Sequence, residues 1–176
     1  MTLDLPEDKR IVIIGCGRSG TKFISKHLGL GHENSVTNRG IACWQAVVDD
    51  NSYYTIEPTD YVLHQVRNPI DTISSCHAIL MKESWDLIIN NIEDMSEEDS
   101  LLLKCMKYWY YWNRMAEKRA LETHRVEDIF SEVPRDTNTR KDLDLYRKVS
   151  WTVMDKEDSD LTSKIKLLSV KYGYNQ

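Results

Sequence analysis

The chain has 176 residues, enough for one domain with a substantial core and too few to favour a second independent domain. Apolar residues make up 41% of it and charged residues 29%, a globular composition that excludes a disordered or fibrous chain. The net charge of −5 argues against a nucleic-acid partner, because such binders carry a basic surplus or stripe, so any positive charge that matters must be local.

The apolar pattern predicts an alternation of strands and helices along the chain. A continuous β-branched apolar run at 10–15 predicts a buried core strand, 61–66 predicts a second, and 122–126 and 53–56 are further candidate strands. Apolar residues at helical spacing predict helices over 21–28, 40–49, 69–81, 97–119, 127–130, 151–154 and 160–172. The polar stretches 32–39 and 132–142 predict loops. This order predicts one α/β domain over residues 1–176, a three-layer sandwich with a small parallel sheet flanked by helices.

The longest predicted helix, 97–119, follows Ser96, which together with Asp99 fits a capping box. Its stripe of apolar and aromatic residues follows the 3.6-residue period. The simplest interpretation of that aromatic density is core packing rather than ligand stacking.

The first ten residues contain no apolar segment of a secretory signal, and no run reaches the ~18 apolar residues that span a bilayer. The four cysteines have no CxxC pair and lie far apart, at Cys16, Cys43, Cys76 and Cys105. Their spacing favours reduced, buried thiols over a disulfide framework or a zinc site. The sequence therefore predicts a soluble cytoplasmic protein without a membrane partner.

The segment GCGRSGTK, residues 15–22, joins the first predicted strand to the first predicted helix. Such a junction gathers unpaired backbone N–H groups and the positive end of the helix dipole, and glycines let the backbone close around an anion. Arg18 and Lys22 add positive charge, and Ser19 and Thr21 add hydroxyl groups. We therefore predict a loop that binds phosphate or sulfate, with a plain structural turn as the alternative.

The loop departs from the pattern of nucleoside triphosphatases, GxxxxGK followed by Ser or Thr. Gly15 and Gly20 keep the spacing, but Thr21 precedes Lys22, which moves the lysine to another side of the helix and removes the magnesium-binding hydroxyl. The second core strand also ends at Arg67 instead of an acid. Both departures disfavour magnesium-dependent phosphoryl transfer.

A second anion site is predicted at the end of the strand 61–66. Arg67 follows this strand, and Ser75 lies eight residues further along, in the helix that Pro69 opens. Ligands bind open α/β sheets at the carboxyl ends of their strands. The two strand ends together predict a ligand with two separated anionic groups.

These two motifs resemble those of the sulfotransferases that use 3′-phosphoadenosine 5′-phosphosulfate (PAPS). GRSGTKF at 17–23 is similar to the family's 5′-phosphosulfate loop, and VRNPIDTISS at 66–75 to its 3′-phosphate motif. Weaker similarity to a compact bacterial branch continues in GHE at 31–33 with Gly40 and Trp44, YWYYWN at 108–113, RVEDI at 125–129 and YGY at 172–174. The resemblance implies a P-loop-like sulfotransferase fold.

The resemblance also implies site residues and a cofactor. PAPS would be the donor, adenosine 3′,5′-bisphosphate (PAP) the product, and no metal would be required. The nucleotide would contact Gly17, Arg18, Ser19, Gly20, Thr21, Lys22, Arg67 and Ser75, with Arg140 and Lys141 as candidates from a basic loop that closes the site in larger members.

Among these residues, Arg18 and Lys22 would stabilise the transferring group. Glu33 would accept the acceptor's proton, because many family members place a glutamate there. His32 is the alternative base, since the pKa of a histidine lies near neutrality. The acceptor implied is a hydroxyl of a small molecule or, preferably, a glycan. A magnesium-dependent P-loop kinase and a non-catalytic nucleotide-binding module remain open as other functions.

Overall fold

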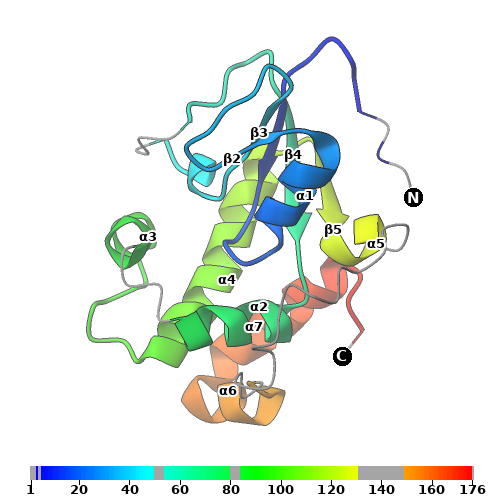
Figure 1. Ribbon diagram of the computed structural model, residues 1–176. Helices are drawn as coiled ribbons and strands as arrows, with labels where there is room; N and C mark the ends of the chain where they lie inside the picture. The colour runs from blue at the N-terminus through cyan, green and yellow to red at the C-terminus, as the bar shows by residue number, and fades with distance from the viewer. Residues whose placement is uncertain (1–2, 4, 50–53, 80–83, 131–148, 176) are drawn as a thin grey trace.

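The computed structural model describes residues 3, 5–49, 54–79, 84–130 and 149–175 (Figure 1). The strands are β1 (Ile11–Ile14), β2 (Gly31–His32), β3 (Gly40–Ala42), β4 (Tyr61–Val66) and β5 (Glu122–Arg125). The helices are α1 (Thr21–Leu28), α2 (Pro69–Ile79), α3 (Trp85–Asn91), α4 (Leu101–Arg119), α5 (Val126–Phe130), α6 (Trp151–Glu157) and α7 (Ser159–Lys171), with a 3₁₀ turn η1 (Gln45–Val47). None of the helices in these ranges is long and apolar enough to cross a membrane.

The strands form one five-stranded parallel sheet in the order β2-β3-β1-β4-β5. β1 lies at its centre, and all four of its residues are buried, as expected for a strand with helices on both faces. Ile11 and Ile13 point into one apolar cluster, and Val12 and Ile14 point into the other.

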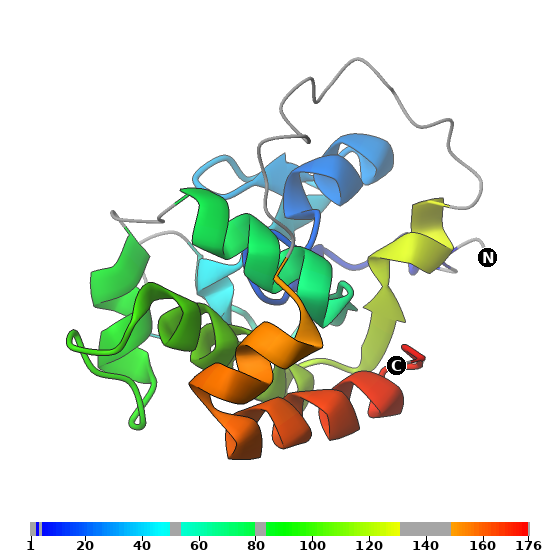
Figure 2. The same ribbon diagram turned by 90° about the horizontal axis from the view of Figure 1, so that it is seen from below.

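Helices cover both faces of the sheet, so the domain has three layers. Ile24 of α1 and Ile129 of α5 lie in the smaller cluster on one face. The larger cluster on the other face is built on α4, which packs against α2, α6 and α7. Figure 2 shows α1 and α7 on opposite sides of the molecule. The predicted α/β class with a small parallel sheet flanked by helices is therefore confirmed.

The chain leaves the two central strands in opposite directions. From β1 it passes through α1 to the edge strand β2, and from β4 it passes through α2, α3 and α4 to the other edge strand, β5. The carboxyl ends of β1 and β4, which pair directly, therefore form the topological switch point of the sheet. Open α/β sheets bind their ligands at such a point.

Several predicted elements are wrong in detail. Residues 40–42 form strand β3 instead of opening a helix, and only η1 is helical in that stretch. Gly31 and His32, at the start of the predicted loop 32–39, form β2. The described residues of the candidate strand 53–56 contain no strand. Gly40 explains the first error, because its φ is +131° and an added Cβ would lie 1.9 Å from the Ile11 carbonyl oxygen. Such close pairing between segments distant in sequence overrides local helical periodicity.

The start of α4 also differs from the prediction. The hydroxyl of Ser100 caps the helix by accepting a hydrogen bond from the Leu103 N–H. The backbone N–H of Ser96 does donate to the Asp99 carboxylate, but this bond closes a separate turn before the helix begins. Serine is a favourable N-cap residue at both positions, but only Ser100 directly precedes the first residue of α4.

Candidate anion-binding site

The loop between β1 and α1 passes very close to β4. A Cβ added at Gly15 would lie 2.2 Å from the Gln65 carbonyl oxygen, so this position admits only glycine without a backbone shift. Further along, Arg18 has a φ of 71° and Gly20, the N-cap of α1, has a φ of 92°. Two left-handed residues within three positions turn the loop tightly over the start of the helix.

Side chains from α4 and β4 hold this loop from below. The Gly17 N–H donates to the Tyr108 hydroxyl at 2.7 Å, and the Cys16 N–H donates to Asn113 Oδ1 at 3.4 Å. Gln65 Nε2 donates to the Ser19 carbonyl oxygen at 2.6 Å. These partners are buried, so the loop is fixed by the core of the domain.

Other backbone donors of the loop point elsewhere. The N–H groups of Arg18, Gly20, Thr21 and Lys22 donate to no residue in the described ranges, and no side chain caps the helix at Gly20. The first N–H groups of a helix carry partial positive charge and need a partner from outside the helix. This end of α1 can therefore accept an anion.

The two sequence motifs meet at this loop. Arg18 Nε donates to the Ser75 hydroxyl at 3.1 Å, and an Arg67 guanidinium nitrogen donates to the Arg18 carbonyl oxygen at 3.2 Å. Ser75 is buried in α2, whereas both arginines are half-buried. Arg18 is 49 positions from Arg67 and 57 positions from Ser75 in the sequence. The fold thus brings these three residues together as one cationic site at the switch point.

Asn68 and Pro69 explain how the second motif is shaped. Pro69 is the first residue of α2, where the missing N–H of proline is harmless. Asn68 Oδ1 accepts a hydrogen bond from the Ile70 N–H at 3.0 Å and so caps the helix. The cap sets the start of α2 directly after Arg67, which keeps the arginine at the edge of the sheet.

The two arginines of this site lack the carboxylate partners that three other arginines have. Arg10, Arg119 and Arg125 each pair with an aspartate, at Asp60, Asp49 and Asp128. Arg18 and Arg67 instead donate to a hydroxyl and a carbonyl oxygen, and neither forms an ion pair with any carboxylate in the described part of the chain. Half-buried cations with neutral partners add local positive charge to the site, although the Glu127 carboxylate accepts a hydrogen bond from the Asn68 N–H next to Arg67.

The two candidate bases lie beside the start of α1, at the carboxyl end of β2. The Thr21 hydroxyl and His32 Nε2 are 3.3 Å apart, and His32 Nε2 lies 3.8 Å from the Glu33 carboxylate. Burial lowers the pKa of His32, the Glu33 charge opposes this effect and the Lys22 charge adds to it, so the ring is neutral at pH 7. Lys22 itself is exposed on the first turn of α1.

Backbone strain marks the same residues. Within the described ranges, the non-glycine residues with positive φ are Arg18, at 71°, and Glu33, at 53°. The Glu33 conformation is held by a hydrogen bond from its N–H to the Ala42 carbonyl oxygen at 3.2 Å. Left-handed non-glycine residues cost about 1–2 kcal/mol and gather at functional sites.

A buried polar network behind the loop was not predicted from the sequence. His64 Nε2 lies 3.1 Å from Asn113 Oδ1, and His64 Nδ1 lies 3.1 Å from the Thr123 hydroxyl. Asn113 and His64 are fully buried. The available signal was the pair of polar residues, His64 and Gln65, inside an otherwise apolar strand, because buried polar groups must be hydrogen-bonded.

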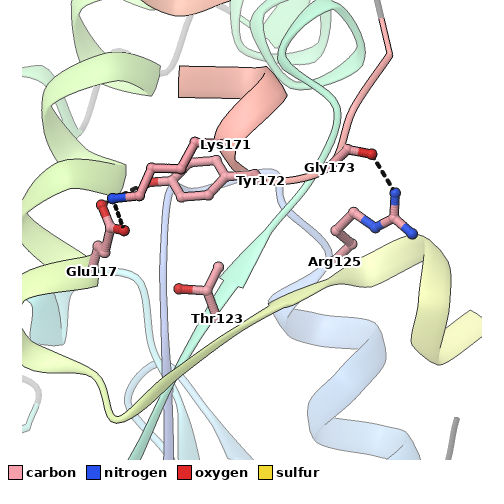
Figure 3. Close-up of a pocket in the computed structure, with 6 residues that line it drawn as sticks. All are labelled: Glu117, Thr123, Arg125, Lys171, Tyr172 and Gly173. Carbon is pink, nitrogen blue, oxygen red and sulfur yellow. Dashed lines mark hydrogen bonds and ion pairs between the residues drawn. The ribbon is translucent and has the colours of Figure 1, made fainter. Parts of the chain in front are cut away.

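A pocket of about 390 Å³ lies away from the loop, between β5, α4 and the end of α7 (Figure 3). Its charged groups already have partners: Lys171 pairs with Glu117, and Arg125 donates to the Gly173 carbonyl oxygen. It is therefore less suited to an anion than the open loop.

The remaining candidates, Arg140 and Lys141, lie outside the described residues. In the described ranges no group of three or more histidine, cysteine, aspartate or glutamate residues is placed to hold a metal ion. Comparison of the chain with models of known protein families, with curated proteins and with solved structures gives no match.

Proposed function

We propose that the chain is a sulfotransferase with a P-loop-like fold, which transfers a sulfuryl group from PAPS to an acceptor hydroxyl. The proposal is carried by the meeting of Arg18 and Arg67, two half-buried cations that come from the two motifs and have neutral partners. An anionic ligand would supply the counter-charge that neither arginine has among the described residues.

The two motifs, each with its own anion-binding groups, support a nucleotide phosphorylated at both the 3′ and 5′ carbons. The open N–H groups of Gly20, Thr21 and Lys22 suit the 5′-phosphate at the start of α1. Arg67 and the buried Ser75 suit a 3′-phosphate at the end of β4. This assignment follows the resemblance of both motifs to the sulfotransferase family.

The reaction is an in-line displacement at sulfur. A bond forms between the acceptor oxygen and sulfur as the bond from sulfur to the 5′-phosphate oxygen breaks. Arg18 and Lys22 would offset the charge on the sulfonate and on the leaving phosphate oxygen, and Glu33 would take the acceptor's proton. Loss of one such electrostatic contact lowers the rate by about a hundredfold or more.

A carbohydrate hydroxyl is the acceptor we favour. The proposed base, Glu33, lies soon after the loop, as it does in glycan sulfotransferases. Its carboxylate is half-buried beside His32, with 44% of the side chain exposed, so an acceptor can reach it from solvent.

Thermal unfolding tests the donor directly. We expect PAP at a hundredfold excess over its dissociation constant to stabilise the protein by about 2.7 kcal/mol and to raise the unfolding midpoint by about 5–10 °C. Adenosine 5′-monophosphate, which lacks the 3′-phosphate, should raise it far less. Stabilisation by ATP with magnesium, without an effect of PAP, would instead identify a P-loop kinase.

Two variants make the test specific to the site. Arg67→Ala should abolish most of the shift with PAP. Arg119→Ala is the matched control, because Arg119 also donates to a backbone carbonyl oxygen, that of Val47, but far from the loop in the sequence. Transfer of labelled sulfate from PAPS to a panel of sugars and phenols then separates an enzyme from a non-catalytic nucleotide-binding module.

A further inference from the structure

The hydrogen bonds of the loop 16–20 divide its backbone groups into two sets. The N–H groups of Cys16 and Gly17 point inward to Asn113 and Tyr108 of α4. Among the next donors, the Ser19 N–H turns back to the Cys16 carbonyl oxygen at 3.2 Å, and the N–H groups of Arg18 and Gly20 donate to no described residue. The two inward bonds therefore fix the backbone directly before the open amides.

The carbonyl oxygens of the loop are engaged as well. That of Cys16 accepts from the Ser19 hydroxyl at 2.5 Å, that of Gly17 lies 3.9 Å from Cys76 Sγ, and those of Arg18 and Ser19 accept from Arg67 and Gln65. A carbonyl oxygen facing an anion would repel it. Engaging these oxygens with donors and leaving the amides open gives the loop the polarity that an anion needs before the anion arrives.

Asn113 is held in one orientation by its other contacts. Its Nδ2 donates to the Trp109 carbonyl oxygen at 2.7 Å, so its Oδ1 is free to accept. That oxygen accepts from the Cys16 N–H and from His64 Nε2. His64 therefore carries its proton on Nε2, and its Nδ1 accepts from the Thr123 hydroxyl.

Tyr108 is equally constrained. Its ring is fully buried and packs edge-on against Trp44, Trp85 and Trp112, with centroid distances between 5.2 and 6.2 Å. This packing places the hydroxyl oxygen at a fixed point under Gly17. A phenylalanine at this position would fill the same space and would remove the hydroxyl, which accepts from the Gly17 N–H and also interacts with the Cys16 thiol.

We propose that Tyr108 and Asn113 are positioning residues, which hold the loop 15–20 in its anion-binding conformation without touching the ligand. The inference rests on the proposed function only for the identity of that ligand. Without the Tyr108 hydroxyl the Gly17 N–H is buried without a partner, and loop conformations that satisfy it in another way gain population. Apparent affinity then falls in proportion to the fraction of loops that remain competent.

The test compares Tyr108→Phe with Tyr54→Phe. Tyr54 is also buried, and its hydroxyl donates to the Asp60 carboxylate at 2.8 Å in another part of the molecule. Both variants lose one buried hydroxyl, so both should lose stability. Only Tyr108→Phe should speed hydrogen exchange at the Gly17 amide in the free protein and weaken PAP binding by about tenfold.

Asn113→Leu is the second variant, because it removes the acceptor of Cys16 at nearly constant volume. It should give the same two effects, at the Cys16 amide and on PAP binding. The inference is overturned if both loop variants, measured at a temperature where they are folded, bind PAP within twofold of the wild type.

The measurement in the free protein separates this inference from the proposed function. If the wild type binds no PAP, the sulfotransferase proposal fails, and exchange at Gly17 together with binding of inorganic pyrophosphate still decides the positioning role. Unchanged Gly17 exchange in Tyr108→Phe would then refute it. Faster exchange with weaker pyrophosphate binding would sustain it for an anion other than PAP.

Discussion

His64 makes the stability of the protein depend on pH. The ring is fully buried between β5 and α4, and burial is the main cause that lowers its pKa from 6.5 to about 4. The hydrogen bond to Asn113 and the charge of Glu117 oppose this shift, and the charge of Lys171 adds to it. The neutral ring satisfies the network, because one nitrogen donates to Asn113 and the other accepts from Thr123.

The sign and size of the effect follow from proton linkage. The unfolded chain binds a proton at this residue below about pH 6.5, whereas the folded protein does so only below about pH 4. Stability from the neutral ring is therefore complete above pH 6.5 and is lost as the pH falls toward 4. A shift of this size corresponds to about 3 kcal/mol in full, of which about 2 kcal/mol is lost between pH 7 and pH 5.

Urea unfolding of wild type and His64→Gln at pH 7 and pH 5 measures this contribution. A glutamine amide can donate toward Asn113 and accept from Thr123, but it does not titrate. We expect the wild type to lose about 2 kcal/mol more than the variant between the two pH values. His32, whose pKa is also lowered, is present in both proteins and cancels in the comparison. Equal losses would show that His64 does not titrate as a buried neutral ring.

Two further substitutions test the loop and the proposed base. Gly15→Ala should lower the free energy of unfolding by about 2–3 kcal/mol, because its Cβ would lie 2.2 Å from the Gln65 carbonyl oxygen. Gly29→Ala, also at positive φ but with no atom within 4 Å of the added Cβ, should cost about 1 kcal/mol, and equal losses in urea unfolding would refute the close approach. Glu33→Gln should slow sulfate transfer by about a hundredfold or more and leave PAP affinity unchanged. Normal turnover in that variant would leave His32 as the base to test.

The central and most regular parts of the fold could be predicted from the sequence. β1 is a continuous apolar run and β4 is apolar except for His64 and Gln65, and such runs in a chain of alternating elements have few other placements. β2 and β3 have two and three residues, too few for any periodicity. They are strands because β3 pairs with the distant β1 and β2 pairs with β3, and local patterns contain no record of that pairing.

Some residues of the site could likewise be predicted from the sequence, and others could not. Arg18, Arg67 and Ser75 follow strand ends or lie in the next helix, so their order along the chain was enough to predict that they share one edge of the sheet. Tyr108 and Asn113 lie on a helix whose aromatic stripe has the same spacing whether it packs a core or holds a loop. Only the tertiary structure distinguishes the two cases, because the deciding feature is which backbone N–H lies opposite each side chain.

The negative net charge of the chain does not prevent its cationic site from binding an anion. A chain of net charge −5 repels anions at long range, and the Debye length of about 8 Å in physiological salt confines that repulsion to the surface. At the switch point Arg18 and Arg67 are half-buried, so solvent screens them less than it screens exposed charges. A ligand with a single phosphate would engage one strand end and leave the other cation without a counter-charge. A ligand with two phosphates would neutralise both at once, and under the proposed function this would be the physical basis for discrimination by the 3′-phosphate.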